Sequence, residues 1–143
     1  MILLDTNVVS ALAGGADQGL ISDWVDRLGP GTAWISTITA AELRLGVALL
    51  PDGRRKQGLD KWCETLIARF TELGCVAEFD LAASRHFAVG KAKARQNGRE
   101  VNSFADAAIG AIALAGRCPV ASRDTSPFEA LGVEVIDPWS AAG

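Results

Sequence analysis

The chain has 143 residues, of which 49% are hydrophobic and 22% charged, the composition of a folded protein rather than a disordered one. This length suits a single domain over residues 1–143 that buries a core of its own. The longest run of small apolar residues, 107–116, is too short to cross a bilayer, and we find no signal-peptide pattern. We therefore expect a cytoplasmic protein without a membrane role.

The net charge of −3 excludes attraction of nucleic acid by overall charge alone. Acids outnumber bases in residues 1–50 and again in 101–143, whereas bases outnumber acids in 51–100. A protein with this distribution needs a local basic patch or a bound cation if it is to handle phosphates. Three widely spaced cysteines without a CxxC pair indicate core residues rather than zinc ligands or disulfides.

The first half of the chain predicts two short strands separated by helices. An apolar strand over residues 1–4 runs into Asp5, and Gly14-Gly15 ends the helix that follows. Gly29-Pro30-Gly31 is a second break. The predicted elements are helices at 6–13 and 19–28, a strand at 33–36, and a helix from Thr37 to about residue 50.

The second half continues the alternation of helices and short strands. The predicted elements are a helix ending near Leu73, a strand at 75–79, a helix from Asp80 to about Asn97, a helix at 103–115, and strands at 119–122 and 133–136. Such alternation predicts a parallel sheet covered on both faces. The fold class is therefore α/β, a three-layer α/β/α sandwich with about five short strands.

Four acids occupy positions at which parallel sheets bind ligands. Asp5 and Asp124 follow apolar strands, and ligands bind beyond the carboxyl ends of such strands. Glu42 and Asp106 lie in the first turns of predicted helices. Glu42 shares a helical stripe with Ile38, Leu45 and Leu49, so we expect it on an inward face.

Each acid also has a structural explanation. The patterns Thr39-x-x-Glu42 and Ser103-x-x-Asp106 match a capping box, in which an acid reaches back to the helix N-terminus. Asp5 could cap the first helix and Asp124 could begin an Asx-turn. The functional interpretation rests on all four acids occurring together.

Converging carboxylates raise one another's pKa values, and a divalent cation relieves that repulsion. Oxygen ligands without Cys or His favour Mg²⁺ or Mn²⁺ over zinc. Such an ion also lets an acidic pocket accept a phosphodiester.

Four segments carry a resemblance to a known family: ILLDTNVVS, TITAAELRLG, FADAAIGAIALA and ASRDTSPFEALGVEVIDPW. In this order they resemble a PIN-domain ribonuclease, and more narrowly the VapC/FitB type of toxin from bacterial toxin–antitoxin pairs. The resemblance spans essentially the whole chain. It implies a compact α/β/α sandwich whose acids hold Mg²⁺ or Mn²⁺ for RNA cleavage.

The resemblance assigns the family's first three acids to Asp5, Glu42 and Asp106. Many members close with an Asn and, three residues later, an Asp; here these positions are Asp124 and Pro127. Proline cannot ligate a metal, so Asp124 carries the fourth role. We expect Asp5 and Asp106 to ligate directly and Glu42 and Asp124 to ligate or to orient water. Thr6 and Asn7 are expected to hydrogen-bond within the pocket.

The basic middle of the chain is a candidate RNA surface, with a solvated helix face as the alternative. Its residues are Arg85, Lys91, Lys93, Arg95 and Arg99. His86, the one histidine, is interpreted as a packing or surface residue, because a metal-activated water removes the need for a histidine base.

The leading hypothesis is a metal-dependent endoribonuclease that acts as a toxin. The resemblance implies a 5′-phosphate product, a homodimer, and a cognate antitoxin through which the protein would reach DNA indirectly. A phosphatase of the DxDx[TV] type is disfavoured because Asn7 replaces the second Asp. The remaining alternative is a non-enzymatic regulatory module acting through a DNA-binding partner.

Overall fold

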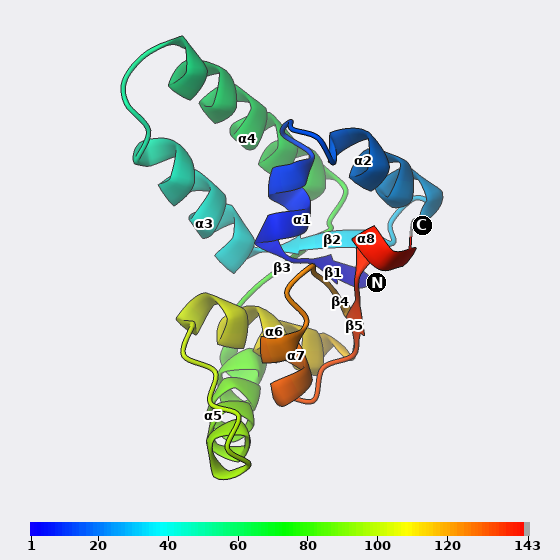
Figure 1. Ribbon diagram of the computed structural model, residues 1–143, viewed down its shortest axis with the longest axis vertical. Coiled ribbons are helices and arrows are strands. Elements are labelled where there is room, and N and C mark those ends of the chain that lie inside the picture. The colour runs from blue at the N-terminus through cyan, green and yellow to red at the C-terminus, as the bar shows by residue number, and fades with distance from the viewer. Residues whose placement is uncertain (142–143) are drawn as a thin grey trace.

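A computed structural model describes residues 1–141 of the chain, and Figure 1 shows a central sheet with helices on both sides. All strand pairs are parallel, and the strand order is β3-β2-β1-β4-β5. This confirms the predicted three-layer α/β/α class. The strands are β1 (Ile2–Leu4), β2 (Ala33–Ser36), β3 (Val76–Ala77), β4 (Val120–Ala121) and β5 (Val135–Ile136).

The helices follow the predicted alternation, with two short additions after β4 and β5. Their bounds are α1 (Thr6–Ala11), α2 (Gln18–Arg27), α3 (Thr37–Ala48), α4 (Arg54–Glu72), α5 (Leu81–Gln96), α6 (Phe104–Gly116), α7 (Ser126–Ala130) and α8 (Pro138–Ala141). Asp80 caps α5 as expected, because its carboxylate accepts a hydrogen bond of 2.9 Å from Ala83 N. In the part of the chain described, no helix combines the length and apolarity needed to span a bilayer.

The central strand β1 separates two hydrophobic cores. Leu3 and Leu4 are both fully buried, and because successive strand residues point to opposite faces, they enter different cores. Leu3 belongs to the core beneath α5, α6 and α7, and Leu4 to the core beneath α1 to α4. Burial on both faces is the environment typical of a central parallel strand.

Small residues on α6 allow α7 to pack closely against it. A Cβ added at Gly110 would lie 2.6 Å from Leu131 Cδ1, and one added at Gly90 of α5 would lie 3.3 Å from Leu131 Cδ2. The buried Leu131 side chain is therefore held between two helices at points that lack a side chain. This packing fixes the chain just after α7, and with it the segment that leads from β4.

The three cysteines are free, and two of them, Cys63 and Cys75, are buried as predicted. Cys118 is partly exposed.

Candidate active site

Asp5 lies at the carboxyl end of the central strand, between the ends of its two neighbours. Its backbone N donates to Ala121 O at 2.9 Å, which aligns it with the end of β4. Its Oδ1 accepts from Thr6 N at 2.8 Å, so it caps α1 as the structural alternative proposed. Its Oδ2 accepts from Ser122 Oγ at 2.7 Å, and only 5% of the residue is exposed. The capping role therefore leaves Asp5 buried at the carboxyl end of the central strand.

Ser122 connects the residues of this pocket, and the sequence analysis did not identify it. Its fully buried hydroxyl also accepts from Asn7 Nδ2 at 3.0 Å and from Asp124 N at 3.1 Å. Asn7 Oδ1 in turn accepts from Arg123 N at 3.3 Å. The signal of Ser122 in the sequence is a polar residue directly after an apolar strand, which is weaker than that of an acid because serine is common at strand ends for structural reasons. Asn7 hydrogen-bonds to the same serine that holds Asp5, and its role in a functional pocket stays a prediction.

Glu42 is held at the pocket by Thr6, whose Oγ1 donates to Glu42 Oε1 at 2.5 Å. The proposed capping box at Thr39 is wrong. The N-cap of α3 is Ser36, whose Oγ accepts from Thr39 N at 3.0 Å. Glu42 is thus partly buried and is not explained as a helix cap.

The predicted inward stripe on α3 is also wrong. Leu45 and Leu49 are 58% and 75% exposed, whereas Thr39, Ala40 and Leu43 are buried. The reason is that α3 covers the sheet only with its first turns. Its later turns extend away beside α4, as Figure 1 shows.

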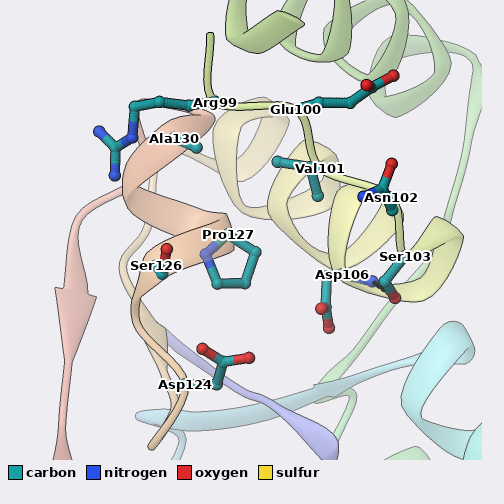
Figure 2. Close-up of a pocket in the computed structure, with 10 residues that line it drawn as sticks. All are labelled: Arg99, Glu100, Val101, Asn102, Ser103, Asp106, Asp124, Ser126, Pro127 and Ala130. Carbon is teal, nitrogen blue, oxygen red and sulfur yellow. Dashed lines mark hydrogen bonds between the residues drawn. The ribbon is translucent and has the colours of Figure 1, made fainter.

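Asp106 lies in the first turn of α6, where its backbone N donates to Ser103 Oγ at 3.2 Å. The Ser103 half of the predicted capping box is therefore present. The Asp106 side chain and that of Asp124 line one cavity of about 360 Å³. Figure 2 shows both carboxylates at the same end of this cavity, approached from α6 and from the loop after β4.

Burial and mutual repulsion act on these carboxylates together. Burial raises the pKa of Asp5 to about 6, hydrogen bonds from Ser122 and Thr6 oppose the rise, and the charges of Asp106 and Glu42 add to it. The pKa of Asp106 is also raised, first by burial and then by the charges of Asp124 and Glu42. The four predicted acids therefore share one electrostatic site.

This site suits a divalent cation by its donors, all of which are oxygens. Within residues 1–141 no three acid, histidine or cysteine side chains lie close enough to surround one ion. Mg²⁺ does not require such a cage, because it commonly takes one or two carboxylates and completes its shell with water and phosphate. A bound cation would lower the raised pKa values of these carboxylates.

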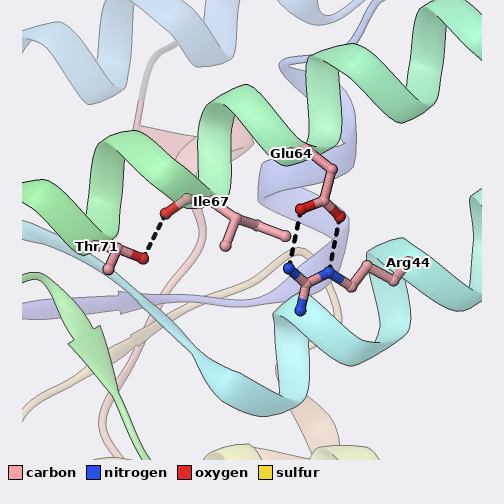
Figure 3. A network of polar contacts seen from close by, with 4 residues as sticks. All are labelled: Arg44, Glu64, Ile67 and Thr71. Carbon is pink, nitrogen blue, oxygen red and sulfur yellow. Dashed lines mark hydrogen bonds and ion pairs between the residues drawn. The ribbon is translucent and has the colours of Figure 1, made fainter.

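A second cavity, of about 600 Å³, reaches Glu42 on the side of the sheet that α1, α3 and α4 cover. Thr6 and Glu42 line it together with apolar residues of α3 and α4, including Val47, Leu59 and Trp62. Arg44 of α3 and Glu64 of α4 join these helices through hydrogen bonds of 2.8 and 2.9 Å, shown in Figure 3. Both side chains are about half exposed, so the pair aligns the helices more than it stabilises them.

The predicted basic residues do not form one surface at the acids. Arg99 lines the cavity of about 360 Å³. The other four residues lie on α5 and do not line this cavity: Arg85, Lys91, Lys93 and Arg95. Lys91 Nζ lies 5.4 Å from the Phe87 ring centroid, and Arg95 faces Glu100 at 4.0 Å. A contact of these four residues with an RNA backbone stays a prediction, beside the alternative of a solvated helix face.

The chain is similar to proteins of known type over nearly its whole length. It is 45% identical to the plasmid stability protein StbB of Pseudomonas syringae, 41% to the VapC ribonuclease Y4jK of Sinorhizobium fredii and 38% to toxin FitB of Neisseria gonorrhoeae, covering 97–99% of this chain and 99–100% of theirs. It superposes with a TM-score of 0.89 on a chain of FitAB bound to an IR36 DNA fragment, with 37% identity and coverage of 97% and 96%.

A sequence model of the PIN domain matches residues 2–134, which include all four acids. Family membership thus agrees with the fold and with the resemblance carried by the four sequence segments. The chain belongs to the PIN domain family.

Proposed function

We propose that this protein is a Mg²⁺- or Mn²⁺-dependent endoribonuclease and the toxin of a toxin–antitoxin pair. The observation that carries the proposal is the coupling of Asp5, Glu42, Asp106 and Asp124 at the carboxyl edge of the sheet. The names of two relatives, a VapC ribonuclease and toxin FitB, support the same reaction class and role.

In the proposed reaction, water adds to a phosphodiester phosphorus and the bond to the 3′ oxygen breaks, leaving a 5′-phosphate and a 3′-hydroxyl. Asp5 and Asp106 would hold the cation, with Glu42 and Asp124 as further ligands or as acceptors that orient water. The bound cation would acidify water and neutralise charge on the phosphate. Ser122 and Thr6 fix the orientations of Asp5 and Glu42 through their hydroxyls.

The proposed partner is a cognate antitoxin that occupies the apolar cavity between α1, α3 and α4. A segment bound there would cover Thr6 and Glu42 and so block the site. The FitAB neighbour was solved bound to DNA, which supports an antitoxin through which this toxin reaches DNA indirectly. We further propose a homodimer acting in the cytoplasm, where its RNA substrate lies.

The test is cleavage of RNA by purified, antitoxin-free protein with Mg²⁺, with Mn²⁺ and with EDTA. We expect cleavage with either metal, none in EDTA, and a loss of at least about 100-fold in Asp5→Asn and Asp106→Asn, since removing one preorganised charged group typically costs that much. Asp80→Asn, which alters a carboxylate that caps α5 and lines neither cavity, is the matched control.

Product ends should carry a 5′-phosphate. If the wild-type protein cuts no RNA with any metal, or if Asp5→Asn cuts equally well, the ribonuclease proposal is wrong. In that case a non-enzymatic module that acts through its DNA-binding partner becomes the better explanation.

A further inference from the structure

The polar cavity continues beyond Asp106 and Asp124 toward the segment 99–103, which joins α5 to α6. We propose that it binds one nucleotide of single-stranded RNA next to the scissile phosphate, with Arg99 contacting a backbone phosphate and Asn102 the base. This inference rests on the proposed ribonuclease function, and it assigns residues that would set where the RNA is cut.

The size and lining of the cavity suit a nucleotide. Its volume of about 360 Å³ is near the lower end of pockets that bind small molecules, and a nucleotide is a ligand of that scale. Polar and charged side chains dominate the lining, including Ser103 and Ser126. The larger cavity on the other face of the sheet is lined mainly by apolar side chains. RNA therefore fits the first cavity better than an amphipathic peptide does.

Arg99 is the cation in the lining of this cavity. Figure 2 shows Asp106 and Asp124 at one end and Arg99 at the other, beside Glu100, whose side chain points the opposite way. The Arg99 side chain is 52% exposed and faces Glu129 at 4.0 Å, at the outer limit of an ion pair. Such an exposed pair contributes little, so the guanidinium is available to a phosphate, which it binds with two parallel hydrogen bonds. The acids would act on one phosphate while Arg99 holds a neighbouring one.

Asn102 is placed to read a base because the residues on both sides of it are fixed. Val101 is buried, with 4% of its surface exposed, and Ser103 caps α6. Arg99 N donates to Ala94 O at 2.8 Å, which anchors the start of the segment. The exposed Asn102 amide carries donors and an acceptor that match base edges. Because its neighbours are held in place, the Asn102 backbone would lose little conformational entropy when the side chain binds a base.

The first experiment measures RNA binding without cleavage. Arg99→Gln and Arg95→Gln are each made in an Asp5→Asn background, and anisotropy of a labelled single-stranded RNA of mixed sequence is followed across a salt series. We expect Arg99→Gln to weaken binding about tenfold and to lower the salt slope by about one phosphate contact. Arg95, 78% exposed and outside the cavity, is the matched control and should change affinity less than about twofold.

The second experiment maps cut sites with otherwise wild-type active protein. Asn102→Ala should relax the nucleotide preference at one position beside the cut by about fivefold, the loss expected for one hydrogen bond. The melting temperature of Asn102→Ala should match that of the wild type, because the residue is exposed.

The outcomes separate this inference from the ribonuclease proposal. If the wild type cuts RNA but Arg99→Gln equals Arg95→Gln in binding and Asn102→Ala keeps the wild-type cut sites, the subsite is wrong and the ribonuclease stands. If backbone amide signals of residues 99–103 shift with the cognate antitoxin and not with RNA, the cavity belongs to the partner and the subsite is also wrong. If the wild type neither binds nor cuts RNA, both proposals fail.

Discussion

The hydroxyl of Ser122 donates a hydrogen bond of 2.7 Å to the buried carboxylate of Asp5. This contact joins the ends of β4 and β1, the two strands that bring the pocket together. The same oxygen accepts from the side chain of Asn7 and from the backbone of Asp124. A residue that is neither acidic nor basic therefore organises the site.

Ser122→Ala should lower the free energy of unfolding by about 1–3 kcal/mol, because it leaves buried polar groups without a partner. Urea denaturation of the purified protein measures this. Ser84→Ala removes a hydroxyl that bonds only to Leu81 O at the exposed start of α5 and should change stability by less than about 0.5 kcal/mol. Equal effects in the two variants would contradict the role of Ser122.

Stability without metal should fall as pH rises through the titration of Asp5. Its folded pKa of about 6 lies above the ordinary value of 3.8, so the folded state holds the proton more tightly than the unfolded state. The stabilisation is present below pH 4 and is lost as pH rises toward and past 6. The shift corresponds to about 3 kcal/mol at most.

Urea denaturation in EDTA at pH 5 and pH 7.5 tests this dependence. Asp5→Asn should lose less stability than the wild type between these two pH values, because asparagine does not titrate. Adding Mg²⁺ at pH 7.5 should stabilise the wild type and have a smaller effect on Asp5→Asn. A wild-type protein that grows more stable over this range relative to Asp5→Asn would show that the direction of the shift is wrong.

Thr6→Val should reduce RNA cleavage about tenfold, because Glu42 loses the hydroxyl that bonds it at 2.5 Å. Valine keeps nearly the shape of threonine, so the change removes the hydroxyl, with its contacts to Glu42 and Thr39, and leaves the packing nearly unaltered. Thr6→Ser retains the hydroxyl and should cleave within about threefold of the wild type. The rate at saturating RNA is the measurement, and full activity in Thr6→Val would exclude a positioning role.

Gly110→Ala should destabilise the protein by about 1–2 kcal/mol, since the new methyl group would lie 2.6 Å from Leu131 Cδ1. Gly46→Ala is the control, because nothing lies within 4 Å of its added Cβ, and it should stabilise α3 by about 0.5–1 kcal/mol. Thermal or urea unfolding measures both. Combining Gly110→Ala with Leu131→Val should cost less than the sum of the single changes.

The sequence predicted the parts of the fold that have strong local signals. The apolar run before Asp5 became β1, Gly74 follows the end of α4, and Asp80 and Ser103 cap their helices. The strands β3, β4 and β5 are shorter than expected, at two residues each, because only those residues pair with a neighbour. The short helix α7 was missed because five residues carry no helical periodicity.

The charged residues of the site could be predicted from the sequence, and the uncharged residue that holds them could not. Four acids could be recognised at strand and helix ends, whereas Ser122 gave no signal until its position beside β1 was known. The inward face of α3 was misassigned because Leu45 continues the helical period after the helix has passed the edge of the sheet. Both errors depend on contacts between segments far apart in sequence, which local patterns do not contain.

The position of β1 in the middle of the sheet also governs when the site around Asp5 can form. Asp5 depends on Ser122, which follows it by 117 residues, and β1 needs β4 on one of its two sides. Until residues 120–136 have left the ribosome, β1 has an open edge and Asp5 has no hydroxyl partner. The site can therefore assemble only once the first residues of the chain and residues 120–136 have both been synthesised.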